Sequence, residues 1–155
     1  MRPILLFLAV GCMQMSAQVV LRVNDSAPVT ITAEDLAKLP RHSAVLNDHG
    51  KQVHYEGVLL QNVLARGGID FGKGLRGKQM STYVAVLASD GYEAVFALAD
   101  LDPTIGNSGI LVADQHQGQP LGEKEGPLRI IVPHDQRPAR SVRLVREIDV
   151  VQLQK

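Results

Sequence analysis

The stretch that decides the fold is GQPLGEKEGPLRIIVP, residues 118–133. Its first half belongs to a polar loop, Gln115 to Pro127, whose glycine and proline residues oppose regular secondary structure. Its second half is a short apolar strand, Leu128 to Val132, and a similar apolar strand, Ile110 to Ala113, precedes the loop. Short apolar runs bounded by turn residues predict buried strands, so this part of the chain is expected to be β-structure.

The rest of the chain adds further short strands joined by clearly marked turns. Asp48-His49-Gly50 and Ser89-Asp90-Gly91 have the residues that turns favour, and Asp-Gly between two strands predicts a hairpin. The other predicted strands are Gln18–Val23, Ser43–Leu46, Gln52–Tyr55, Met80–Ala88, Tyr92–Leu98 and a last one in which Val142, Leu144, Arg146, Ile148 and Val150 alternate with mostly polar residues.

Two helices are predicted between these strands. Thr32 caps the first, Ala33–Leu39, with Asp35 as an incomplete capping box, and Pro40 ends it. The second has Leu59, Leu60, Val63 and Leu64 on one face and ends at Gly67-Gly68. Roughly seven or eight strands with two or three short helices predict an α+β, β-rich fold, in a single domain over residues 18–155.

Composition excludes several classes of protein. Lys plus Arg equals Asp plus Glu at 16 each among 155 residues, and aromatic residues make up 4%. A neutral chain with so few aromatic side chains lacks the basic, stacking surface of a nucleic-acid-binding protein. Apolar residues make up 45%, which favours a folded core over disorder. A single cysteine excludes a disulfide framework and a thiolate metal cage within the chain.

The first 17 residues have the layout of a signal peptide. Arg2 precedes an apolar run, Ile4 to Val10, and Ser16-Ala17 supplies small residues for cleavage after Ala17. The run is about half of the roughly 20 residues that a membrane-spanning helix needs, so no membrane span is expected. We therefore expect a periplasmic or secreted protein. The alternatives are a buried N-terminal element and a lipoprotein acylated at Cys12.

Familiar catalytic and metal-binding motifs lack their required context. Gly72-Lys73-Gly74-Leu75-Arg76-Gly77 has the letters of a dinucleotide-binding loop, but the predicted helix precedes it and the strand follows, the reverse of that motif. We expect neither a nucleotide nor a haem cofactor. The five histidines, at positions 42, 49, 54, 116 and 134, lack the spacing of zinc ligands and are expected on the surface or in turns.

Five arginines lie close together near the C-terminus. They are Arg129, Arg137, Arg140, Arg143 and Arg146. The planar, permanently charged guanidinium group suits phosphate or carboxylate, so one interpretation is a binding site for an anion. The alternative is a solvated strand face whose arginines pair with Glu147 and Asp149.

Several segments resemble, in order and spacing, the oxidoreductase molybdopterin-binding domain of the sulfite oxidase family. The most specific is residues 118–133; the others are Asp90-Gly91-Tyr92, Ile110–Asp114, Ala139–Arg143 and, upstream, Tyr55–Leu60. The resemblance implies a β-rich fold around a pterin pocket, with molybdopterin as the candidate cofactor. Matched by position, Arg140, Ser141 and Arg143 are the expected pterin and phosphate contacts, with Arg143 where family members usually have lysine. His134 to Arg137 are expected to line the loop beside them.

Two features depart from the family. Its members bind molybdenum through one cysteine ahead of the segment that Tyr55-Glu56-Gly57 matches, but Arg41 to Gln52 here contains His42, Ser43 and His49 and no cysteine. Neither imidazole nor hydroxyl is an obvious replacement for the soft thiolate. Exported members leave the cell folded, by a twin-arginine signal, whereas Arg2 stands alone. Both departures predict that the redox centre is absent.

The sequence therefore predicts an exported binding module rather than a working oxidoreductase. Its expected partner is an anionic small molecule or an envelope protein, bound through Arg137–Arg143, with no nucleic acid. One alternative is a molybdenum-dependent oxidoreductase in which His42 replaces the cysteine, and another is an envelope interaction scaffold. The candidate site residues are His42, His134, Arg137, Arg140, Ser141 and Arg143.

Overall fold

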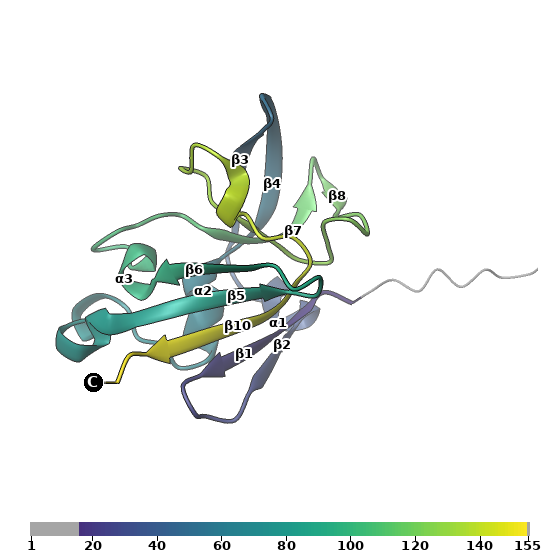
Figure 1. Cartoon of the computed structure of the whole chain (residues 1–155). Coiled ribbons are helices and arrows are strands. Elements are labelled where there is room, and N and C mark those ends of the chain that lie inside the picture. The colour runs from purple at the N-terminus through teal and green to yellow at the C-terminus, as the bar shows by residue number, and fades with distance from the viewer. Residues whose placement is uncertain (1–15, 155) are drawn as a thin grey trace, which may run out of the picture.

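Two five-stranded sheets form the framework of the computed structural model, which describes residues 16–154 (Figure 1). Sheet A has the strand order β2-β1-β10-β5-β6, and sheet B has the order β3-β4-β7-β8, with β9 also paired to β7. The predicted β-rich α+β fold is confirmed. Residues 1–15, which hold most of the expected signal peptide and Cys12, lie outside the described residues.

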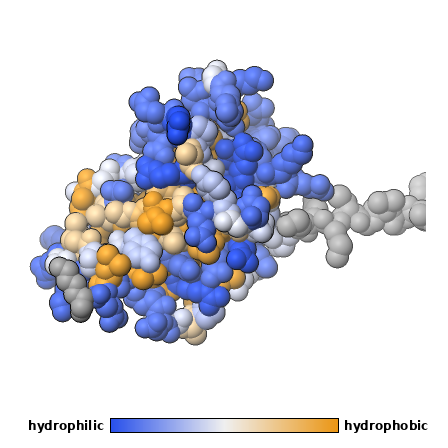
Figure 2. Space-filling view, in the orientation of Figure 1, coloured by the Kyte–Doolittle hydropathy of each residue, from blue (hydrophilic) through white to orange (hydrophobic). Residues whose placement is uncertain are grey.

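Sheet A has one face in the core and one face toward solvent. Its strands are β1 (Gln18–Val23), β2 (Val29–Thr32), β5 (Thr82–Ala88), β6 (Glu93–Ala97) and β10 (Val145–Gln152). β1 runs parallel to β10, and the other neighbours are antiparallel. Buried and half-buried residues alternate along β5, as the pleat requires. Figure 2 shows apolar side chains on the outward face of this sheet, whereas the end of the molecule formed by β3 and β4 is hydrophilic.

Sheet B is antiparallel throughout and contains a hairpin that projects from the molecule (Figure 1). Its strands are β3 (Arg41–Asp48), β4 (Lys51–Leu59), β7 (Leu111–His116), β8 (Gln119–Pro120) and β9 (Arg129–Ile131). β3 and β4 confirm the predicted hairpin and extend it at both ends. At the turn, His49 and Gly50 have positive φ angles of 51° and 83°, and the Gly50 N–H donates to Asn47 Oδ1 across 3.0 Å.

Short helices fill the spaces between strands. They are α1 (Ala33–Ala37), α2 (Leu60–Arg66), α3 (Leu98–Leu101) and the 3-10 turns η1 (Gly72–Gly74), η2 (Gly77–Ser81) and η3 (Pro138–Arg140). α1 ends earlier than predicted, but its capping box is complete, because Thr32 and Asp35 each accept a hydrogen bond from the other's backbone N–H. Within residues 16–154, no helix is long and apolar enough to cross a membrane.

The core has two parts. The larger cluster joins the buried face of sheet A to α2 and to residues of β4, β7 and β9. A smaller cluster lies at the base of the β3–β4 hairpin and consists of Leu46, Tyr55, Leu111, Ala113 and Ile131. This second cluster anchors the base of the hairpin on β7 and β9.

The last strand begins later than its alternating sequence predicts. β10 starts at Val145, not Val142, because Leu144 has a left-handed φ of 54° and the register to β5 shifts between Val145 and Glu147. The Leu144 N–H donates to the Glu125 carbonyl across 2.8 Å, which holds this irregular residue in place. The strand expected from Met80 begins instead at Thr82, because Met80 and Ser81 belong to η2, and β2 was not predicted.

Candidate functional site

A hollow of about 210 Å³ lies where the β3–β4 hairpin tip, β9 and the chain around η3 meet. Its walls come from four segments far apart in the sequence, which are the hairpin tip, the β5–β6 turn, β9 and the chain from η3 toward β10. The lining residues are Asp48, His49, Asp90, Tyr92, Arg129, Pro138, Ala139, Ser141, Val142 and Arg143. Seven of these ten side chains carry a polar or charged group, which can orient a ligand through hydrogen bonds and charge.

Hydrogen bonds in which backbone groups donate or accept hold these segments together. The Val132 N–H donates to Ser141 Oγ across 3.0 Å, and the Ile130 N–H donates to the Val142 carbonyl across 2.7 Å. On the other side, the Tyr92 hydroxyl donates to the Ala139 carbonyl across 2.6 Å. These bonds join β9, η3 and the β5–β6 turn into one wall, so Ser141 has a mainly structural position.

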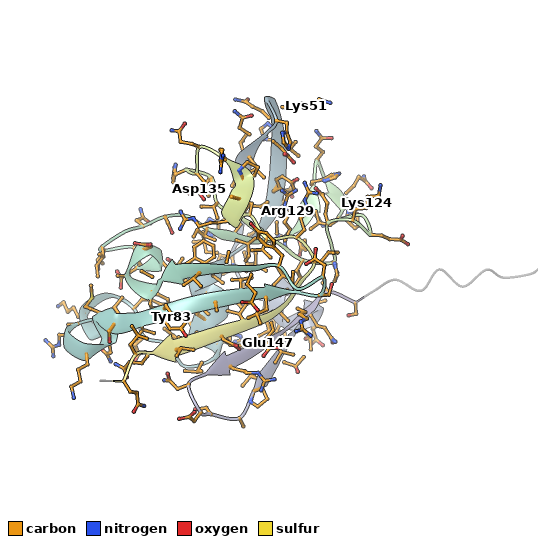
Figure 3. The ribbon with its side chains drawn as sticks, in the orientation of Figure 1. Lys51, Tyr83, Lys124, Arg129, Asp135 and Glu147 are labelled. Carbon is orange, nitrogen blue, oxygen red and sulfur yellow. The ribbon has the colours of Figure 1, made fainter. Side chains whose placement is uncertain are left out.

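Arg129 forms the inner wall of the hollow and is 1% exposed. Its Nη1 donates to Glu125 Oε1 and to the Tyr55 hydroxyl oxygen, each across 2.6 Å, and its guanidinium carbon lies 5.1 Å from the Tyr55 ring centre. Figure 3 shows Arg129 in the interior, between the hairpin that carries Lys51 and the loop that carries Lys124. A buried guanidinium needs such a counterion, because removing a charge from water is costly.

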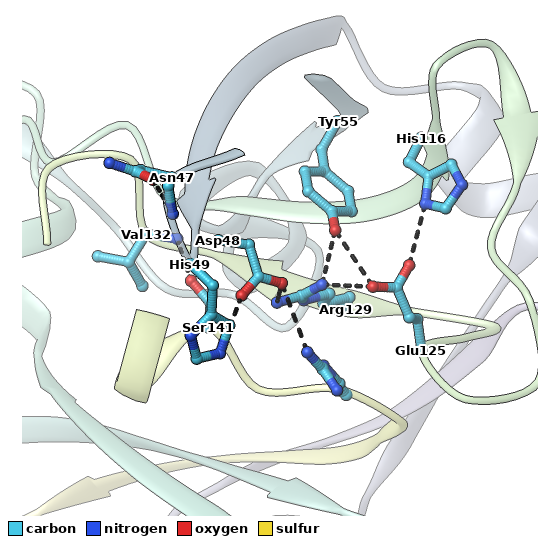
Figure 4. A network of polar contacts seen from close by, with 11 residues as sticks. Asn47, Asp48, His49, Tyr55, His116, Glu125, Arg129, Val132 and Ser141 are labelled. Carbon is cyan, nitrogen blue, oxygen red and sulfur yellow. Dashed lines mark hydrogen bonds and ion pairs between the residues drawn. The ribbon is translucent and has the colours of Figure 1, made fainter. Parts of the chain in front are cut away.

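Glu125 extends this network toward the surface (Figure 4). Its Oε1 also accepts from the Tyr55 hydroxyl across 3.2 Å, and its Oε2 lies 3.0 Å from His116 Nδ1. Burial raises the pKa of Tyr55 to about 12, because the phenolate is disfavoured away from water. Tyr55 therefore stays neutral and can donate to Glu125.

Asp48 lies between Arg129 and Arg143 at the mouth of the hollow. Its Oδ2 is 3.5 Å from Arg143 Nη2 and 3.9 Å from Arg129 Nη2, and its Oδ1 is 3.6 Å from His49 Nε2. The Arg143 side chain is 49% exposed, and Asp48 is its one ion-pair partner among residues 16–154. Arg143 thus presents guanidinium N–H donors to the hollow.

The structure separates the predicted arginines. Arg143 and Ser141 line the hollow, whereas Arg140 is held elsewhere by two hydrogen bonds of 2.9 and 2.6 Å to Asp135 and stacks 5.2 Å from the Phe96 ring centre. Arg137 is exposed just before η3 and has no ion pair in the described part of the chain. The alternative pairing fails, because Glu147 and Asp149 pair with Arg22 on β1.

The predicted histidines lie away from the hollow. His134 is exposed in the loop after β9. His42 is exposed on β3 opposite Gly57, six residues before Asp48, which is roughly 20 Å along an extended strand. The histidine that lines the hollow is His49, at the hairpin turn.

Sequence reasoning missed the buried half of the site. Tyr55, Glu125 and His116 were not candidates, and Arg129 was counted only as one member of the basic cluster. One local signal was present: Arg129 stands between Leu128 and Ile130 in an apolar strand, where a charge must find a buried partner. The partner Tyr55 lies 74 positions away, so spacing along the chain did not indicate it.

The donor chemistry of the site does not fit molybdenum. No group of three or more His, Cys, Asp or Glu side chains in residues 16–154 is arranged to hold a metal ion. Cys12 lies outside the described residues, and the residues that line the hollow offer imidazole, carboxylate and hydroxyl groups but no soft thiolate.

Comparison with known proteins agrees with this fold. Residues 47–155 match the family described as oxidoreductase molybdopterin binding domain. No curated protein matches the chain. Twenty-eight chains of solved structures match, among them one from the sulfane dehydrogenase SoxCD of Paracoccus pantotrophus, with a TM-score of 0.66 and 17% sequence identity. The match covers 86% of this chain but 38% of that one, so this chain spans well under half of that protein's length.

Proposed function

Because the chain belongs to the oxidoreductase molybdopterin-binding domain family, we propose that it is a member without a molybdenum centre that binds a small anionic ligand in the hollow. The observation that carries the proposal is the guanidinium of Arg143, half exposed at the hollow above the buried Arg129. Planar guanidinium groups recognise phosphate and carboxylate through paired N–H donors.

The lack of a molybdenum centre follows from the donor set. The segment Arg41–Gln52 brings Asp48 and His49 to the hollow, and neither side chain is the soft ligand that molybdenum prefers. The hollow of about 210 Å³ is also smaller than the roughly 300 Å³ at which pockets for drug-sized ligands begin. We therefore derive no redox step and expect a ligand smaller than an intact pterin cofactor.

Arg143 has the features of a ligand-binding residue rather than a structural one. It makes no hydrogen bond within the described residues, and its one ion pair is long, at 3.5 Å. Its donors can therefore turn to a ligand oxygen without breaking a hydrogen bond. Arg140, by contrast, already donates twice to Asp135, so we exclude it from ligand binding.

We also propose that the protein is exported and that residues 1–17 are removed, which places the hollow in the periplasm or outside the cell. The support is the basic residue, apolar run and small residues of that segment. Export in the unfolded state would separate the chain from a cofactor made in the cytoplasm, which agrees with a site that lacks a molybdenum ligand.

Phosphate titration of the mature chain, residues 18–155, tests the binding proposal. We expect Arg143→Ala to weaken phosphate binding about tenfold or more, the equivalent of losing one charge-assisted hydrogen bond. Arg146→Ala is the matched control, because Arg146 is exposed on β10 and does not line the hollow. Equal phosphate affinity in the wild type and both variants would contradict the proposal and favour a scaffold that recognises a partner elsewhere.

A further inference from the structure

We infer that Asp48 is an internal anion that competes with ligands for Arg143, so that an anion binds to the hollow by displacing it. The inference rests on the proposed function, and it assigns to Asp48 control over which ligands the hollow accepts. Asp48 is the last residue of β3, and its carboxylate reaches the mouth of the hollow from the hairpin tip.

The contacts of Asp48 with neighbouring cationic side chains are ion pairs without hydrogen bonds. Its oxygens lie 3.5 to 3.9 Å from the nitrogens of Arg143, His49 and Arg129, and it makes no hydrogen bond with any of these side chains. Its Oδ1 is buried without a hydrogen-bond partner. A ligand oxygen at hydrogen-bonding distance from Arg143 would be bound more strongly than this carboxylate, because charge-assisted hydrogen bonds strengthen as they shorten.

Release of Asp48 leaves one cation without a partner. Arg129 keeps Glu125, which is 2.6 Å away, whereas Arg143 has no second partner among the described residues. The remaining charged groups at the hollow are Asp90, which is exposed at the rim, and His49 if it is protonated. With Asp48 in place, its carboxylate therefore offsets the positive charge of Arg143, and without it the mouth of the hollow has an unpaired guanidinium that can bind an anion.

The hairpin tip lies outside the core. Asp48 is followed by the turn residues His49 and Gly50, both exposed, and the nearest core residue on β3 is Leu46. The tip projects from the body of the molecule (Figure 1). A small displacement of the tip would separate Asp48 from Arg143 and leave the cluster under the hairpin intact.

Replacing Asp48 with asparagine tests the inference, because it removes the charge and keeps the shape. Two like charges about 4 Å apart near a protein surface repel strongly, and a competitor that occupies the site lowers apparent affinity by the occupied fraction. We expect Asp48→Asn to bind phosphate about tenfold more tightly than the wild type. Asp25→Asn is the matched control, since it removes the same charge at an exposed position between β1 and β2 that does not line the hollow.

Two further measurements test whether phosphate binds by displacing Asp48 from Arg143. The double variant Asp48→Asn with Arg143→Ala should lose the gain, because the released cation is then missing. In the wild type, phosphate should also increase amide hydrogen exchange at the hairpin tip, residues 47–52, since binding releases Asp48 from Arg143. Unfolding midpoints of the variants, measured in parallel, confirm that each one is folded.

The outcomes separate this inference from the proposed function. A gain in Asp48→Asn that is absent in Asp25→Asn supports it. Equal gains in both variants would show a general charge effect and overturn it, as would unchanged affinity in Asp48→Asn when Arg143→Ala still weakens binding. If neither the wild type nor any variant binds phosphate, the proposed function itself fails.

Discussion

The guanidinium of Arg129 donates to the carboxylate of Glu125 across 2.6 Å, and this pair holds the buried Arg129 in the inner wall of the hollow. The two residues are four positions apart, on β9 and in the loop that precedes it. The hydroxyl group of Tyr55, on β4, donates a hydrogen bond to Glu125 and accepts one from Arg129. The pair therefore connects the hairpin to the loop whose sequence decides the fold.

Removing one member of this pair should destabilise the protein more than removing both. Arg129→Met leaves Glu125 without its buried counterion, and such a loss costs about 3–5 kcal/mol. The double variant Arg129→Met with Glu125→Gln should recover part of that loss, because no uncompensated charge remains. Urea unfolding followed by circular dichroism measures both. A loss below about 1 kcal/mol in Arg129→Met, the value typical of an exposed pair, would contradict the account.

Ser141 is expected to act on stability through one hydrogen bond. Its Oγ accepts from the buried Val132 N–H, and an unsatisfied buried donor costs about 1–3 kcal/mol. Ser141→Ala should lower the free energy of unfolding by that amount. Ser43→Ala, at an exposed position on β3, should change it by less than about 0.5 kcal/mol. Equal effects in the two variants would show that Ser141 does not hold η3 on β9.

Gly57 is required for the packing of β4 against β7. A Cβ at this position would overlap the Val112 carbonyl oxygen and the Ala113 Cα, both backbone atoms that cannot move without breaking the sheet. Gly57→Ala should therefore cost at least the roughly 1–3 kcal/mol of an overpacked core. Gly122→Ala is the control, since that position has open space and no positive φ. A Gly57→Ala variant with wild-type stability would contradict the close packing of β4 against β7 at this position.

The stability of the protein should fall between about pH 10 and pH 12. The pKa of Tyr55 is raised to about 12 in the folded state from its ordinary value of 10.0. The unfolded chain therefore loses this proton at lower pH than the folded one, so stability decreases as pH rises through that window. Tyr55→Phe should reduce the slope of unfolding free energy against pH there, as measured by urea unfolding at a series of pH values, and an unchanged slope would contradict the account.

Local signals in the sequence predicted the hairpins and the cap. Asp48-His49-Gly50, Ser89-Asp90-Gly91 and the Thr32–Asp35 pair depend on residues within a few positions of each other, and the structure has two turns and a capping box there. The strand Gln18–Val23 was predicted with its observed bounds. In these cases the residues that determine the conformation are neighbours in the sequence.

Features that depend on contacts between residues far apart in the sequence could not be predicted from local signals. The irregular backbone at Leu144 is held by Glu125 and Ser89, so the alternation from Val142 to Val150 gave too early a start for β10. Arg129 can be buried because Tyr55 and Glu125 accept hydrogen bonds from its guanidinium group. The hollow itself needs Asp48 and Arg143, which are 95 positions apart, to lie on the same side of β9.

Molybdenum and pterin content test the central claim most directly. The protein should be purified from a host that makes the cofactor, both after export with its own N-terminal segment and after cytoplasmic expression without residues 1–17. Molybdenum is measured by mass spectrometry, and pterin by fluorescence after oxidation. We predict no stoichiometric molybdenum in either preparation, because the described residues supply no thiolate. Near-stoichiometric molybdenum and pterin in the exported protein would contradict the account and show that a redox centre is present.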